Sequence, residues 1–314
     1  MSYLLSRFFK YTKKVLSRWS VYNYLRMILV DKSEENMKIT ISAESAIDLP
    51  KDFLEKYQIK TIPFTVLLGE KMFLDGEMEI TEMFDYVDKT KVLPKTSAVN
   101  EYQFTEHFAK LKKDADAVIH FSMASSMSCA YSNAVSASKK FEHIYVIDSK
   151  SLSAGIALLA IKASKMANSG KGVEQILEEI NKDIPKIQVS LVLNKLDYLR
   201  KGGRCSGLVC FGANLLQIHP QLILKNGKLS PSKKYRGNFD KCVESYVNDT
   251  LEQFDKYDKD IVFLMYTTLS EKAKEKAKEL LKNAGFKQIV EAKTGATISS
   301  HVGPNAMGVL YLTK

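Results

Sequence analysis

The stretch AVIHFSMASSMSCAYSNAVSASKKFEHIYVIDSKSLSAGIALLAIKASKMAN, residues 117–168, sets the fold class of this chain. It contains two short apolar runs, 117–121 and 144–147, whose length and composition are typical of buried strands. A polar loop and a helical stretch follow each run, and the helices are predicted over 132–140 and 153–168. Alternation of strand, loop and helix predicts an α/β fold with a parallel sheet. The ligand site of such a sheet lies in loops beyond the carboxyl ends of its strands.

The residues before this stretch continue the same alternation. Further strands and helices are predicted over residues 38–42, 51–57, 59–68, 81–89 and 101–111, of which the first and third are strands. Three polar groups fall in predicted loops: Thr96-Ser97, residues 125–128 and Asp148-Ser149. Residues 37–185 are therefore predicted to form an N-terminal α/β domain with a mainly parallel sheet flanked by helices.

The residues after Pro185 follow a different order. A strand is predicted over 187–193, and Asn226-Gly227 predicts a hairpin turn after the apolar residues 222–224. Later elements are predicted as a helix over 240–257, a strand over 261–266, a helix over 271–284 and two short final strands. Strands joined both by a hairpin and by helices predict a mixed or antiparallel sheet with helices on one face. Residues 186–314 are therefore predicted to be a C-terminal α/β domain.

Composition is that of a soluble globular protein. The 314 residues are 45% hydrophobic and 26% charged, which is enough for two domains with sizeable cores. The four cysteines, Cys129, Cys205, Cys210 and Cys242, show no CxxC spacing, and the five histidines are scattered singly. These spacings argue against a disulfide framework and a structural metal site, and they favour a reduced, cytoplasmic protein.

The formal net charge of +10 comes mainly from the N-terminus. Residues 1–30 hold six of the 46 Lys and Arg residues and no acidic one, so 40 basic and 36 acidic residues remain, a net charge of +4. A basic footprint spread over the body of the protein is therefore absent from the sequence. We predict no nucleic-acid partner.

The N-terminal residues 1–36 are predicted to form a basic amphipathic helical extension. Apolar residues recur there every three or four positions, at Leu4, Phe8, Tyr11, Val15, Trp19, Tyr22, Leu25 and Leu29. The uncharged runs are too short to cross a bilayer, and charges interrupt any signal-peptide core. The extension fits a helix on an anionic membrane surface, at the inner face of the membrane. A helix docked on the body or on a partner, and translation from Met37, are the alternatives.

Three segments resemble parts of one oxyanion pocket. The run Arg200-Lys201-Gly202-Gly203-Arg204 places a guanidinium on a glycine bend, and residues 122–128 and 299–304 set polar side chains among small ones. A carboxylate taken out of water needs a paired charge or several donors. Hydroxyls at Thr96 and Ser128, the Arg204 guanidinium and a His301 nitrogen can supply them. A surface salt bridge for Arg204, a helix cap for Ser128 or Thr96 and a core histidine for His301 are the competing interpretations.

Six blocks of sequence together resemble the DegV family over about residues 37–314. The blocks are an acid-Ser-x-x-Asp-Leu-Pro motif at 44–50, Lys95-Thr96-Ser97, residues 125–131, residues 148–151, residues 199–204 and residues 301–306. The resemblance implies a two-domain protein that holds one long-chain fatty acid between its domains. Such a protein presents the fatty acid's carboxylate to a separate ATP-using kinase subunit, which forms an acyl phosphate.

The resemblance also implies the site residues and the absence of a cofactor. The ligand contacts would come from Thr96, Ser97, Ser128, Cys129, Arg204 and His301, and Arg236, in a basic turn, would dock the kinase. The chain departs from the family pattern at several positions, among them Glu44 for the usual Asp and Cys129-Ala130 for Gly-Thr. No Walker loop occurs, so the chain is predicted to be a binding subunit and not an enzyme.

Two other functions remain open at this point. The first is an acyl hydrolase with Ser128 as nucleophile and His301 as base, although no G-x-S-x-G motif surrounds Ser128. The second is a polyol- or carbonyl-binding subunit of a dihydroxyacetone-kinase-like system. The amount of apolar surface around the pocket distinguishes that second function from lipid binding.

Overall fold

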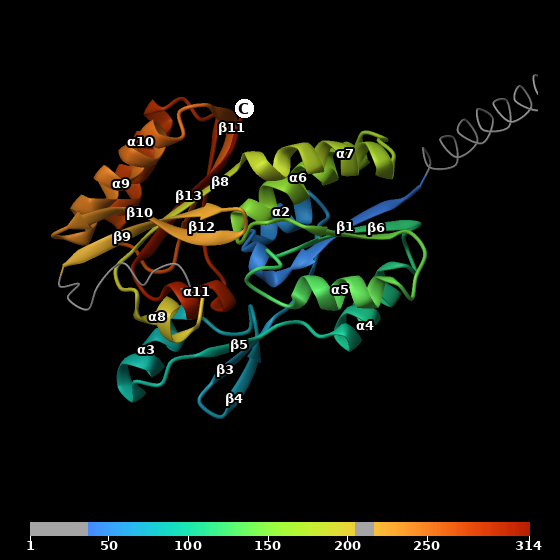
Figure 1. Ribbon diagram of the computed structural model, residues 1–314, viewed down its shortest axis with the longest axis horizontal. Helices are drawn as coiled ribbons and strands as arrows, with labels where there is room; N and C mark the ends of the chain where they lie inside the picture. Colours follow the sequence, from blue (N-terminus) through green and yellow to red (C-terminus); the bar gives the residue numbers. More distant parts are fainter. Residues whose placement is uncertain (1–36, 205–216) are drawn as a thin grey trace, which may run out of the picture.

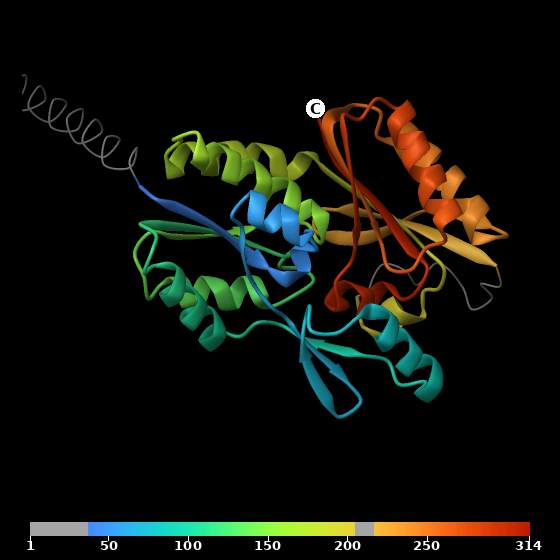
Figure 2. The same cartoon turned by 180° about the vertical axis from the view of Figure 1, so that it is seen from behind.

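The structure is a computed structural model that describes residues 37–204 and 217–314. The predicted extension over residues 1–36 lies outside the described residues, as do Cys205 and Cys210. Strands in the described parts form three sheets, and helices pack against each of them (Figures 1 and 2). In these parts no helix combines the length with the apolar character needed to cross a bilayer.

The first sheet confirms the predicted parallel arrangement. Its strand order is β2-β1-β6-β7, and all three neighbouring pairs are parallel. The strands are β1 (Ile39–Glu44), β2 (Lys60–Ile62), β6 (Ala117–Ser122) and β7 (Ile144–Asp148). The helices around it are α2 (Lys51–Lys56), α4 (Glu101–Leu111), α5 (Ala130–Ser138), α6 (Ala154–Asn168) and α7 (Val173–Asp183). In Figure 1, α4 and α5 cover one face, while α2, α6 and α7 lie on the other.

The second sheet confirms the predicted mixed arrangement. Its order is β10-β9-β8-β13-β11-β12, in which only the β11-β12 pair is parallel. The strands are β8 (Ile187–Leu193), β9 (Ile218–Lys225), β10 (Lys228–Arg236), β11 (Tyr257–Tyr266), β12 (Gln288–Lys293) and β13 (Ala306–Thr313). Helices α9 (Phe239–Gln253) and α10 (Glu271–Asn283) cover its outer face, and α6 contacts β8 and β13 on the inner face (Figure 2).

A third, antiparallel sheet was not predicted. It consists of β4 (Lys71–Leu74), β3 (Thr65–Leu68) and β5 (Lys95–Ser97), in the order β4-β3-β5, with α3 (Ile80–Thr90) beside it. The single strand predicted over 59–68 is wrong, because the chain leaves the parallel sheet after β2 and enters the third sheet at β3. Pro63 lies at the break, where a residue without an N–H cannot continue a central strand. Thr96 and Ser97 therefore lie on a strand and not in a loop after a parallel strand.

Two short helices, which were not predicted, lie beside the proposed pocket segments. Helix α8 (Asp197–Lys201) precedes the Gly202-Gly203 bend, and α11 (Ala296–Val302) carries His301. Helix α11 packs against α8, α3, β3 and β5, so it joins the third sheet to the C-terminal half of the chain. The helix predicted over 240–257 ends at Gln253, because the residues from Tyr257 onward pair in β11.

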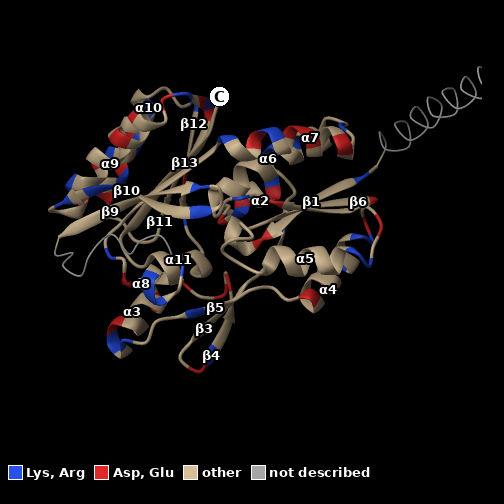
Figure 3. Ribbon diagram, in the orientation of Figure 1, with Lys and Arg blue, Asp and Glu red and all other residues tan. Residues whose placement is uncertain are grey.

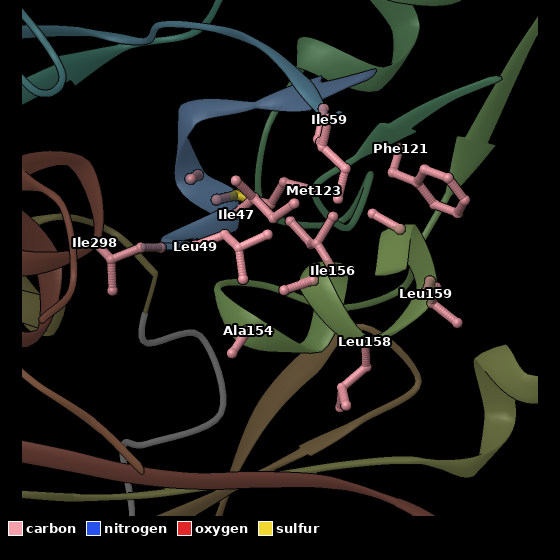
Figure 4. Packing of buried hydrophobic residues seen from close by; sticks show 14 of the residues in the cluster. Ile47, Leu49, Ile59, Phe121, Met123, Ala154, Ile156, Leu158, Leu159 and Ile298 are labelled. Atoms are coloured by element: carbon pink, nitrogen blue, oxygen red, sulfur yellow. The ribbon is translucent and has the colours of Figure 1, made fainter. Parts of the chain in front are cut away.

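One hydrophobic cluster runs through the interface between the first two sheets. It includes Leu49 after β1, Ala154 at the start of α6 and Ile298 on α11, which are labelled in Figure 4. Leu191 on β8 belongs to the same cluster. Separate clusters lie under α9 and α10 and around α3. Because apolar residues of both halves pack together, the interface is a place where an apolar ligand can be covered. A division of the chain at residue 185 stays a prediction.

Candidate functional site

A cavity of about 260 Å³ lies at this interface. Residues from β5, the loop after β6, the end of α8 and α11 line it, and all six predicted ligand contacts are among them: Thr96, Ser97, Ser128, Cys129, Arg204 and His301. Thr96 and His301 are 205 residues apart in the sequence. The fold thus brings the predicted residues into one cavity, while their contact with a ligand stays a prediction.

The remaining lining is largely apolar. Phe64, Leu152, Leu191 and Ile298 contribute to it, and a smaller neighbouring cavity of about 40 Å³ shares the last three of these residues. That second cavity extends between the start of α6 and the inner face of the six-stranded sheet. Polar groups are therefore found beside apolar space that leads toward the core.

The Thr96–His301 pair forms the polar centre of the site. The Thr96 Oγ1 and His301 Nε2 atoms are hydrogen-bonded at 2.9 Å. Burial, and to a smaller extent the nearby Arg204 charge, lower the pKa of His301 to about 4. The imidazole is therefore neutral at pH 7. A β-carbon at Gly202 would lie 2.6 Å from His301 Nδ1, so only glycine permits this packing.

Two buried aspartates hold the helix that carries His301. Oδ1 of Asp48 accepts a hydrogen bond from Gly295 N at 2.8 Å, and Oδ1 of Asp75 accepts one from Thr297 N at 3.3 Å. The second carboxylate oxygen of Asp48 accepts a hydrogen bond from the Ser153 hydroxyl, and that of Asp75 accepts one from the Ser45 hydroxyl. Free N–H groups at a helix start favour such carboxylates. Burial, and then repulsion from Asp75, raise the pKa of Asp48 well above its usual range.

Sequence reasoning assigned no role to this aspartate pair. Asp48 was visible in the Asp-Leu-Pro block, but its partner Gly295 lies 247 residues away. No local pattern marks Asp75, whose helix contact spans 222 residues. The pair links the N-terminal half of the chain to α11.

The loop after β6 is held from three sides. The Glu44 carboxylate accepts a hydrogen bond from Met123 N at 2.8 Å, and Asp148 Oδ1 accepts one from Ser125 N at 3.1 Å. On the third side, the Ser126 hydroxyl donates to the Gly227 carbonyl, at the tip of the β9–β10 hairpin. These contacts fix the path of the chain into Ser128.

Ser128 lies one residue before Cys129, the N-cap residue of α5, so the structure does not make it the helix cap that was the competing interpretation. Its Oγ accepts a hydrogen bond from Ala130 N at 3.1 Å, which satisfies one N–H at the start of α5. A hydroxyl that accepts in this way keeps its own proton, which it can donate to an acceptor in the cavity. The bond to Ala130 therefore leaves Ser128 free to contact an anion, which stays a prediction.

Arg204 lies exposed at the edge of the cavity. Gly203 adopts φ +71° in the bend before it, and the guanidinium Nη1 donates to the Gly202 carbonyl at 2.8 Å. Within residues 37–204 and 217–314, no carboxylate lies within ion-pair distance of Arg204. The surface salt bridge, which was the competing interpretation of Arg204, is thus not seen in the described residues.

Further basic residues surround this edge. Lys91, Lys95 and Lys201 line, with Arg204, an adjoining cavity of about 510 Å³ that also reaches Thr96 and His301. In the ribbon of Figure 3, Lys and Arg positions (blue) lie on α8 and β5 there, whereas α9 and α10 carry both basic and acidic positions. The entrance to the polar centre is therefore positively charged.

Cys129 and Arg236 differ in their distance from the cavity. Cys129 is an exposed free thiol at the start of α5, and it lines the cavity. Arg236 is exposed at the end of β10 and not in a turn, which corrects the sequence interpretation. Seven residues separate it from Leu229, which lines the cavity, a distance of about 23 Å along a strand. Arg236 is not a cavity residue.

The geometry argues against a Ser128–His301 catalytic pair. His301 bonds Thr96, and the Ser128 oxygen accepts a main-chain N–H. A serine nucleophile needs its hydroxyl within hydrogen-bond reach of its base.

Comparison with known proteins gives consistent matches over most of the chain. The sequence model of the DegV family of uncharacterised proteins matches residues 38–314. A fatty acid-binding protein from Thermotoga maritima is 30% identical over 282 residues, which cover 87% of this chain and 96% of that protein.

Solved structures with the same fold lead to the same group of proteins. DegV, a fatty acid binding protein from Bacillus subtilis, superposes with a TM-score of 0.79 at 25% identity, over 89% of this chain and all of that one. A Thermotoga maritima protein whose structure reveals fatty acid binding function has a TM-score of 0.77 at 27% identity, over 89% of this chain and 100% of its own.

Proposed function

This chain belongs to the DegV family, and on that basis we propose that it binds one long-chain fatty acid in the cavity between its two halves. The observation that carries the proposal is a cavity with hydroxyl, imidazole and guanidinium groups beside apolar space. A carboxylate is matched by the polar groups, and burial of the acyl chain against apolar residues supplies the binding free energy.

The head group is proposed to lie at the Thr96–His301 pair. When the neutral His301 carries its proton on Nε2, this N–H donates a hydrogen bond to the Thr96 oxygen. The Thr96 hydroxyl is then free to donate a hydrogen bond to the ligand. Ser128 donates a second bond, and Arg204 supplies the balancing charge. Ser97 and Cys129 complete the polar lining.

We further propose that the bound carboxylate is presented to a separate ATP-using kinase subunit. The open, basic edge around Arg204 supports this, because a second protein can reach the head group there without entering the apolar part. Arg236 is proposed to contact that subunit, in keeping with its exposure and its distance from the cavity. No cofactor is required for binding.

The basic extension over residues 1–30 is proposed to hold the protein at an anionic membrane surface. Its six positive charges each contribute roughly 1 kcal/mol near such a surface, an attraction that salt screens. Deletion of residues 1–36 should abolish salt-sensitive sedimentation with anionic liposomes and leave fatty-acid affinity unchanged. Equal sedimentation of full-length and truncated protein would favour a docked helix or translation from Met37.

The proposed function is tested by titration calorimetry of the protein, freed of bound lipid, with palmitic acid and with dihydroxyacetone. Palmitic acid should bind with one-to-one stoichiometry, dihydroxyacetone should not bind, and Ser128→Ala should weaken palmitic acid binding. The purified chain should show no ATP turnover with fatty acid. Binding of dihydroxyacetone alone would support the polyol alternative, and release of fatty acid from an ester would support the hydrolase.

A further inference from the structure

Thr297 carries a buried hydroxyl that has no protein partner. Four buried side-chain atoms in the described residues lack one, namely Ser151 Oγ, His219 Nδ1, Thr297 Oγ1 and His301 Nδ1. Two of these belong to residues that line the 260 Å³ cavity, Thr297 and His301. Thr297 is only 2% exposed, so bulk water does not compensate its hydroxyl. An unpaired buried hydroxyl destabilises the protein unless something else pairs with it.

The position of Thr297 on α11 relates it to the proposed head-group site. Thr297 and His301 are four residues apart, so they lie one turn apart on the same side of the helix. Ile298 and Val302 have the same spacing and line the same cavity. The cavity side of α11 therefore has a polar row, which extends one turn beyond His301, next to an apolar row.

The backbone of Thr297 is fixed, whereas its hydroxyl is not. Its N–H is bound by Asp75, which holds the residue in the first turn of α11. Threonine in a helix has two accessible χ1 rotamers, and the hydroxyl forms no bond that would lock one of them. Rotation about a single bond can therefore turn the oxygen toward a ligand without moving the helix.

We propose that Thr297 is a further ligand-binding residue, whose hydroxyl donates a hydrogen bond to an oxygen of the bound acid within one helical turn of His301. This inference rests on the proposed function. The acceptor is either the carboxylate itself or an oxygen substituent on the first few carbons of the acyl chain. In both cases a bond unused in the free protein is formed on binding, so the contact contributes to affinity and not to folding.

The test compares Thr297→Val, which keeps the shape and removes the hydroxyl, with Thr297→Ser, which keeps the hydroxyl. Each full-length variant is titrated with palmitic acid and with 3-hydroxypalmitic acid, and its melting temperature is measured without ligand. Ser151→Ala is the control, because it removes another unpartnered buried hydroxyl at a residue that does not line the cavity.

Thr297→Val should melt at the same or a higher temperature, and its affinity should fall about 5- to 30-fold, as expected for one hydrogen bond. Thr297→Ser should keep most of the affinity, and Ser151→Ala all of it. A loss for both acids identifies the carboxylate as the acceptor, and a loss for the hydroxy acid alone identifies the substituent.

Unchanged affinity of Thr297→Val for both acids would overturn the inference and leave the proposed function intact. A lower melting temperature with unchanged affinity would do the same, because it would show that the hydroxyl serves the fold. If the unaltered protein bound neither acid, the proposed function and this inference would fall together.

Discussion

Buried polar groups of this protein form two sets with different hydrogen bonding. The carboxylates of Glu44, Asp48 and Asp75 each accept bonds from a main-chain N–H and a hydroxyl. The cavity residues Thr297 and His301 each keep one buried atom without a protein partner. Paired groups hold loops and helix ends in place, whereas unpaired ones retain capacity for a ligand. Changes in the first set should therefore lower stability, whereas changes in the second should affect binding and, at His301, the pH dependence of stability.

The largest expected effect is a loss of stability in Glu44→Ala. The change leaves Met123 N and the Ser122 hydroxyl without their buried acceptor, and each unpaired group costs about 1–3 kcal/mol. We expect the free energy of unfolding, from urea titration, to fall by about 2–4 kcal/mol. Glu101→Ala is the control, because Glu101 forms a half-exposed ion pair with Lys140. A Glu44 variant as stable as this control would contradict the assignment of Glu44 to the scaffold.

His301→Gln should change how stability depends on pH. The pKa of His301 is about 4 in the folded protein and near 6.5 when unfolded, so only the unfolded chain takes up this proton between those values. This proton uptake by the unfolded chain lowers stability as pH falls from 6.5 to 4, and it has no effect above pH 6.5. The variant should lose this slope, which amounts to up to about 3 kcal/mol.

Urea titrations at pH 7, 5.5 and 4.5 measure the effect in both proteins. Burial, and then His120, also lower the pKa of His107, to about 3, but this group is unchanged in the variant and cancels. Parallel stability curves for the two proteins would show that His301 is not held neutral by burial.

Arg204→Ala should weaken fatty-acid binding without a loss of stability. Arg204 is exposed, and among the described residues its guanidinium bonds the Gly202 carbonyl of its own bend, so little of the described fold depends on this side chain. Loss of a charged partner for the carboxylate should reduce palmitic acid affinity about 10- to 30-fold, measured by calorimetry. Arg200→Ala is the matched control, because Arg200 pairs with Asp197 and does not line the cavity. Equal palmitic acid affinities of the two variants would show that Arg204 does not contact the head group.

Arg236→Ala should have the smallest effect on binding. Because Arg236 lies about 23 Å along β10 from the cavity residue Leu229, palmitic acid affinity should stay within about twofold. Acyl-phosphate formation with the partner kinase should slow, as measured from ATP consumption in the mixture. A large loss of affinity would place Arg236 in the binding site. An unchanged rate of acyl-phosphate formation would argue against a role for Arg236 in docking the kinase.

The sequence could predict those features that local patterns encode. The two main sheets follow from apolar runs and from the Asn226-Gly227 turn, which lies between β9 and β10. Glycines beside Arg204 identified a bend that allows a close approach, and Gly202 does pack against His301. Composition alone was therefore sufficient to single out segments that the fold brings into one cavity.

Features that depend on distant partners could not be predicted in this way. The residues after Pro63 form a strand because β4 and β5 pair with them, and α11 begins where Asp48 and Asp75 meet its N–H groups. Without that helix, the spacing between Thr297 and His301 has no meaning in the sequence. Thr297 was missed for this reason, although an expected helix over 296–302 would have revealed it.

The central claim is that this cavity holds a long-chain fatty acid by its carboxylate. Mass spectrometry of lipids extracted from the purified full-length protein tests it most directly, with Arg204→Ala purified in parallel. We expect close to one fatty acid per unaltered chain and markedly less in the variant. A protein that yields no fatty acid and does not take one up when it is offered would rule out fatty-acid binding in this cavity.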